Sequence, residues 1–92
     1  MSNKVDIANQ TETIRRAREI QILINIIEPD PEYQPFLLTD EASAYDISMA
    51  SAQTITERLE LYLDLSLPVP LTTPLWELVD AIKIASPNWP DN

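Results

Sequence analysis

The chain has 92 residues, a formal net charge of −9 and a hydrophobic content of 45%. This length corresponds to one small domain, expected to span residues 1–92, and the hydrophobic content is too high for a disordered chain. The sequence contains no cysteine, so disulfides and thiolate metal sites are excluded.

Glycine and histidine are also absent. Without glycine, the chain lacks the phosphate-binding loops and nucleophile elbows in which the backbone approaches a ligand closely. Without histidine, it lacks the usual general base and the commonest metal ligand. We therefore expect no catalytic residue, no metal site, no cofactor and no small-molecule substrate, and we predict that the protein is not an enzyme.

The negative charge is concentrated in the middle of the chain. Residues 28–67 hold nine acidic side chains against a single basic one, Arg58. Such a segment repels phosphate backbones and anionic lipids, so binding to nucleic acid or to a membrane is unfavourable. The sequence shows no signal segment and no apolar run long enough to cross a bilayer, which favours the cytoplasm. The expected partner is a protein with a basic surface, or a second copy of this chain in a homodimer.

The first predicted helix begins near Ile7 or Thr11 and ends at Ile27, ahead of Pro29. Apolar side chains recur in it at spacings of three and four, which defines one buried face. The members of this face are Ile14, Ala17, Ile20, Ile24 and Ile27, widened by Leu23. At 100° per residue, Ile22 and Ile26 fall on the far side beside Arg15. This apolar and basic seam is a candidate surface for a partner protein or a second copy.

Arg15, Arg16 and Arg18 form the only basic cluster. They could bind an acidic partner or a phosphate through charge-assisted hydrogen bonds. The favoured interpretation is a solvated helix face, supported by the pairs Glu12–Arg16 and Arg15–Glu19 at a spacing of four.

Residues 28–38 are predicted to form an extended acidic connection, which residues 36–38 attach to the core. Glu28, Asp30 and Glu32 are its candidate contacts for a basic partner. A calcium loop that starts at Asp30 would place Pro35 at the sixth position, where the turn needs glycine. We therefore interpret the connection as a solvated acidic loop.

Two helices are expected in the middle of the chain. A short one should begin at an N-cap formed by Thr39 or Asp40 and continue to about Ile47. A longer one should begin between Ser51 and Thr54, where the pattern 54–57 fits a capping box. Ile55, Leu59 and Tyr62 should line one of its faces.

Leucine or valine occupies every second position from Leu59 to Leu71. Period two is typical of a strand, whereas leucine, glutamate and arginine favour a helix. We predict a helix to about Leu63, followed by an extended proline-rich segment near 64–72. A single strand there is the alternative.

The last helix should begin with Thr73 as the cap and Pro74 at the first helical position, and it should end before Pro87. Its buried face comprises Leu75, Leu78, Val79 and Ile82. Trp76 lies beside that face, as either a partly buried wedge or a partner contact. Residues 1–6 and 87–92 are expected to be flexible tails, unless Trp89 folds back and fixes the second.

The segment 42–63 also has some features of a helix-turn-helix. Residues 42–48 partly follow the pattern A-x-x-L-G-V-S, and the helix with Thr54, Ile55 and Arg58 stands where a recognition helix would. Asp46 replaces the usual glycine, however, and that helix is acidic, although phosphate contacts need positive charge.

The sequence therefore predicts an all-α domain of three longer helices and one short helix. Its expected function is a small acidic, non-enzymatic protein–protein interaction module of a regulatory, adaptor or inhibitor type. The alternative is a transcriptional regulator that binds DNA through residues 42–63. The predicted partner-binding residues are Arg15, Arg18, Ile22, Ile26, Glu28, Asp30, Glu32 and Trp76.

Overall fold

The computed structural model describes residues 10–35 and 38–91, whose regular elements are all helices, so the fold is all-α. Three longer helices, α3 (Ala17–Ile27), α4 (Ala52–Leu63) and α5 (Leu75–Ala85), surround one core. A short helix, α2 (Thr11–Arg15), precedes α3, and two 3₁₀ turns, η1 (Pro31–Tyr33) and η2 (Ala44–Asp46), lie between α3 and α4. No strand occurs in the described part of the chain. Three longer helices and one short helix are present, as predicted, but the short one is α2 and not the helix expected at 39–47.

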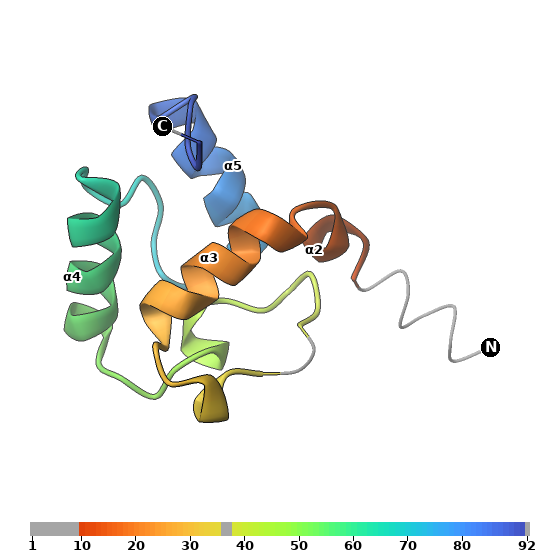
Figure 1. Cartoon of the computed structure of the whole chain (residues 1–92), viewed down its shortest axis with the longest axis vertical. Coiled ribbons are helices and arrows are strands. Elements are labelled where there is room, and N and C mark those ends of the chain that lie inside the picture. Colours follow the sequence, from red (N-terminus) through yellow and green to blue (C-terminus); the bar gives the residue numbers. More distant parts are fainter. Residues whose placement is uncertain (1–9, 36–37, 92) are drawn as a thin grey trace.

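Helix α3 lies at the centre of the fold, between α4 and α5 (Figure 1). Its buried face consists of Ile20, Leu23, Ile24 and Ile27. The apolar spacing predicted this face, and the side chains of α4 and α5 cover it. The helix ends at Ile27 because Pro29 disfavours a helical Glu28, whose backbone is extended.

The predicted first helix is interrupted at Arg16, whose ψ angle of 29° departs from helical values. In a continuous helix, the backbone N–H of Arg16 would donate to the carbonyl of Glu12. Here the Arg16 guanidinium donates a hydrogen bond to the Glu12 carbonyl, at an Nη1–O distance of 3.0 Å. The backbone N–H of Arg16 donates to the Thr13 carbonyl instead. Because α2 and α3 are not one helix, Ile14 does not continue the buried face of α3 and is exposed. Ala17, the first residue of α3, is exposed as well, so the buried face begins at Ile20.

Helix α4 begins one residue after Ser51, whose hydroxyl accepts a hydrogen bond from the N–H of Thr54. The helix therefore starts within the predicted range, but the cap is Ser51 rather than Thr54. Ile55 and Leu59 are fully buried, as predicted, whereas Tyr62 is half-exposed. At the other end Asp64 adopts a left-handed conformation, φ 57°, which terminates the helix in a chain without glycine.

The segment after α4 is extended, as predicted, and its side chains alternate between less exposed and fully solvent-facing positions. Leu71 is buried and Leu67 and Val69 are partly buried against the core, while the residues between them face water. The Leu67 N–H donates to the carboxylate of Glu60 on α4 instead of to a neighbouring strand. Period two in the sequence therefore reflects one-sided packing of an isolated extended segment.

Helix α5 begins at Leu75 after Pro74, and no side chain caps its first turn, so the predicted cap at Thr73 is wrong. Its buried face contains all four predicted residues, Leu75, Leu78, Val79 and Ile82. The Leu75 N–H donates to the carbonyl of Ala42 at 2.8 Å, which ties the start of α5 to the central loop.

Residues 87–91 form a turn in which Trp89 folds back onto the core, the alternative that the sequence left open for this segment. Trp89 is only 5% exposed, joins the core, and donates from its indole Nε1 to the Tyr62 hydroxyl at 3.1 Å. This turn therefore covers the end of the core between α4 and α5. The other expected tail, residues 1–6, and the predicted core contacts of residues 36–37 lie outside the described residues; Leu38 packs against the core as predicted.

The predicted short helix from Thr39 or Asp40 to Ile47 is reduced to the single 3₁₀ turn η2. Its cap is Ser43, which forms a reciprocal capping box with Asp46. The Asp40 carboxylate is used elsewhere, because it binds the beginning of α2.

Two leucines of α4 test the assignment of the core. Leu59 is fully buried and Leu61 is 86% exposed. We expect Leu59→Ala to lower the free energy of unfolding by about 2–5 kcal/mol, because it leaves a cavity in the core. The control Leu61→Ala should change it by about 0.5 kcal/mol or less. Urea unfolding curves of the two variants would measure both values, and equal effects would contradict this packing.

Candidate functional site

The Arg16 side chain is the centre of one polar cluster. Its guanidinium forms a bidentate pair with Asp80 of α5, at 2.7 and 2.9 Å, and a second ion pair with Glu12 at 2.8 Å. It also lies over the Trp76 ring, 5.0 Å from the ring centroid. The Asp80 hydrogen bonds, followed by those to Glu12, raise the pKa of Arg16. The pairs with Glu12 and Asp80 join α2 to α5. Since the charged groups of this cluster have partners within the chain, we interpret the cluster as structural.

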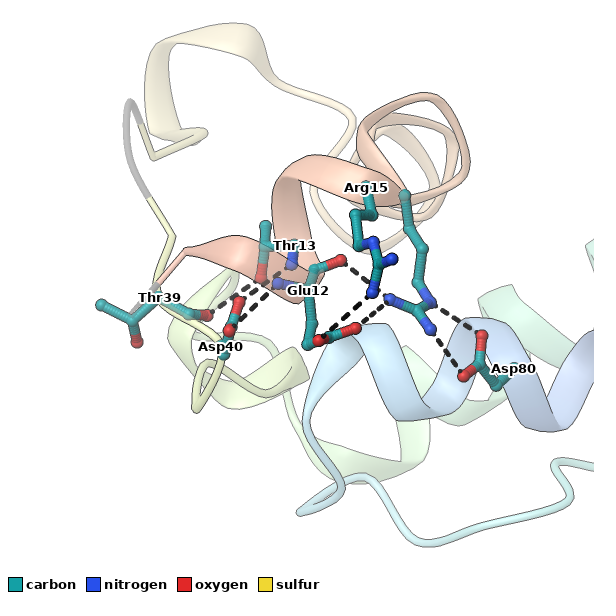
Figure 2. Close-up of polar contacts among 7 residues, drawn as sticks. Glu12, Thr13, Arg15, Thr39, Asp40 and Asp80 are labelled. Atoms are coloured by element: carbon teal, nitrogen blue, oxygen red, sulfur yellow. Dashed lines mark hydrogen bonds and ion pairs between the residues drawn. The ribbon is translucent and has the colours of Figure 1, made fainter. Parts of the chain in front are cut away.

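Asp40 supplies the cap of α2 from a distant part of the chain. Its two carboxylate oxygens accept hydrogen bonds from the backbone N–H groups of Glu12 and Thr13, at 3.1 and 2.9 Å (Figure 2). The Thr13 hydroxyl donates to the Thr39 carbonyl beside it. Desolvation is the largest single effect on the Asp40 carboxyl and opposes its ionisation. The hydrogen bonds from Thr13 and Glu12 together outweigh it, so the pKa of Asp40 is lowered.

Two further ion pairs connect α3 to α5 and to the turn that follows α5. Lys83 binds Glu19 at 2.6 Å, and Arg18 binds Asp91 at 2.6 Å. The hydrogen bond from Lys83 lowers the pKa of Glu19 despite partial desolvation. The predicted Arg15–Glu19 pair is therefore replaced, and Arg15 lies 3.7 Å from Glu12 instead. The predicted Glu12–Arg16 pair is confirmed.

The cap that Asp40 provides should depend on pH. In Asp40→Asn one side-chain oxygen becomes an amide group and can no longer accept from a backbone N–H, so we expect a loss of about 1 kcal/mol at neutral pH. The pKa of Asp40 is lower in the folded protein than in the unfolded chain. The ionised carboxylate therefore contributes its full stabilisation at a pH above the unfolded pKa, and this contribution is lost as the pH falls through the folded pKa. The difference between wild type and variant should therefore shrink in acid. Urea unfolding at several pH values measures it, with Glu41→Gln, on the neighbouring exposed side chain, as the control.

A hollow of about 520 Å³ lies at the end of α3 and is lined by residues of η1, η2 and the loop before α4. We call it the acidic hollow. Tyr33, Tyr45 and Met49 line it and are exposed, Tyr33 by 70% and Met49 completely. The remaining lining residues are Glu28, Asp46, Ile47, Ser48, Ala50 and Arg58. Large apolar side chains that remain in water around a hollow are typical of a binding surface.

The polar groups of the acidic hollow are held in place by neighbouring contacts. Glu28 accepts hydrogen bonds from the Ser48 hydroxyl at 3.1 Å and from the Asp30 N–H at 3.3 Å. Asp46 accepts from the Ser43 N–H at 2.9 Å. Arg58 donates to the Ile27 carbonyl at the end of α3, at 2.9 Å, and has no carboxylate within ion-pair distance among the described residues. These polar groups are therefore positioned by the chain, and the two carboxylates keep acceptor capacity for a ligand.

The structure separates the predicted partner-binding residues. Arg15 and Arg18 are largely exposed, and Arg18 is paired with Asp91. Ile22 and Ile26 are half-buried and pack against the core, so they do not form an exposed seam with Arg15, which lies on α2 beyond the interruption at Arg16. These four residues do not form one surface.

The acidic predicted residues lie closer together. Glu28 lines the acidic hollow. Asp30 caps the 3₁₀ turn η1, and Glu32 is a residue of that turn, next to Tyr33. Trp76 is half-buried beneath Arg16, in the structural cluster. Tyr33, Tyr45 and Met49 were not predicted as site residues from the sequence. The sequence feature that could have indicated them is a large apolar side chain in a segment that contributes to no predicted helical face.

Comparisons of the chain with protein-family models, with curated proteins and with solved structures gave no match. Among residues 10–35 and 38–91, no three acidic side chains converge on a point where a metal ion could be held. Within the same residues, every helix is too short or too polar to cross a membrane.

Proposed function

We propose that this protein is a small, non-enzymatic interaction module that binds a basic protein through the acidic hollow and its rim. The observation that carries the proposal is the group of exposed side chains Tyr33, Tyr45 and Met49 around a hollow with carboxylates in its wall. Exposed aromatic and methionine side chains are enriched where proteins bind each other, and they contribute most of the affinity when a partner excludes water.

The charge of the module favours a partner of opposite sign. Residues 28–67, which include every residue of the hollow, hold nine acidic side chains and one basic one. A basic protein would be attracted to this region at a distance, whereas two copies of the region would repel each other. This supports a different protein as the partner, ahead of a homodimer through the same surface.

The geometry does not favour the alternative of a helix-turn-helix regulator. That unit needs an α-helix before its turn, and the described residues 42–50 contain only the three-residue turn η2. The would-be recognition helix α4 carries Glu57 and Glu60 with Arg58 between them. A DNA backbone would therefore meet negative charge.

A photo-crosslinking side chain at position 49 tests the proposal in the native host, and the matched control places the same group at Leu61, which is also highly exposed. We expect a specific product from position 49 alone. The partner thus identified is then purified and its affinity measured. Met49→Ser and Tyr33→Ser should each weaken binding by about tenfold, and Leu61→Ser should leave it within about twofold.

Added salt should weaken the complex as well, because opposite charges attract across the interface. Three results would contradict the proposal. These are equal crosslinking from positions 49 and 61, an affinity unaffected by Met49→Ser, or a partner that is acidic and binds independently of salt. Urea unfolding of Met49→Ser and Tyr33→Ser would verify that exposed positions were changed without loss of the fold.

A further inference from the structure

The acidic hollow combines two kinds of wall. Tyr33, Tyr45 and Met49 offer aromatic faces and a flexible thioether. Glu28 and Asp46 add two carboxylates, of which each accepts hydrogen bonds from the chain yet retains free lone pairs. A ligand complementary to both walls has an apolar stem and a positively charged end.

Lysine and arginine side chains have this composition. Their methylene stems pack on apolar surfaces, while the charged group stays near water and acceptors. Cations also bind favourably to tyrosine faces, and this effect adds to their attraction to carboxylates. Resting on the proposed function, we infer that the acidic hollow receives one lysine or arginine side chain of the basic partner. Its stem contacts Tyr33, Tyr45 and Met49, and its charge faces Glu28 and Asp46.

Arg58 is the one basic residue in the lining of the acidic hollow. Its guanidinium also lines the hollow, but it is bound to the Ile27 carbonyl at the C-terminal end of α3, where the helix dipole is negative. The lining thus holds two carboxylates against one guanidinium, and Asp30 and Glu32 on either side of Pro31 add further negative charge. If the ligand were an anion, Arg58 would be its main contact, so removal of this charge distinguishes the two cases.

Three blocked tripeptides test the inference, because they differ only in their central side chain. The peptides are Ac-Ala-Lys-Ala-NH2, its norleucine analogue without the charge, and its glutamate analogue. Each is titrated into ¹⁵N-labelled full-length protein while amide shifts are recorded. We expect the lysine peptide to shift the signals of Tyr33, Tyr45 and Met49 and to bind about three- to fivefold more tightly than the norleucine peptide. The glutamate peptide should cause no shifts there.

Charge-neutralising variants make the test specific to the hollow. Glu28→Gln keeps an acceptor for Ser48 and should weaken the lysine peptide by about threefold. Arg58→Gln should strengthen it, and Glu77→Gln, the same charge change on the exposed face of α5, should have no effect. If Glu28→Gln fails to fold, the comparison of lysine with norleucine at low and high salt in the wild type decides whether charge contributes to binding.

Each contrary result has a distinct meaning. Equal binding of the norleucine and lysine peptides, or no shifts with either, would overturn the inference while leaving the binding of a basic protein through the rim intact. Preference for the glutamate peptide, abolished in Arg58→Gln, would overturn it in favour of an anionic ligand. Failure of the proposed function itself would instead appear as a partner complex that does not depend on Met49 or Tyr33.

Discussion

The fold depends on one exchange of hydrogen bonds at Arg16. The guanidinium replaces a backbone N–H at the Glu12 carbonyl, which ends one helix and allows the next to start in a new direction. The same side chain then binds Asp80 and covers Trp76, so the direction of α2 is fixed relative to α5. Asp40 binds the free N–H groups at the other end of α2. A five-residue helix has little stability of its own, and these contacts hold it in place.

The sequence was sufficient for features that depend on neighbouring residues. The faces of α3 and α5 follow from spacings of three and four, and the ends of both helices follow from Pro29 and Pro87. The interruption at Arg16 and the cap from Asp40 were not predictable in this way. The contacts of Arg16 with Asp80 and of Asp40 with α2 join residues 64 and 27–28 positions apart. The bond from Arg16 to the Glu12 carbonyl is local, but a glutamate four residues before an arginine fits a continuous helix equally well, and Asp40 fits the pattern of a local cap.

In the candidate site, too, some features could be predicted from local sequence, and others depend on residues that only the fold brings together. The acidic character of residues 28–67 and the inclusion of Glu28 could be read directly from the sequence, whereas the rim could not. Tyr33, Tyr45 and Met49 come from η1, η2 and the following loop, and only the fold brings them to one hollow. Ile22 and Ile26 illustrate the opposite error. A helical wheel assigns them to the side away from the core, but α3 is covered on more than one side, so both pack inward.

The long-range ion pairs have a consequence for the order of events during synthesis. Glu19, Arg16 and Arg18 find their partners on Lys83, Asp80 and Asp91, which leave the ribosome last among the described residues. Until then the apolar face of α3 has no α5 to cover it, although α4 is already available. The nascent chain should consequently remain only partly packed until residues 75–91 emerge, and it should then close in a single late step.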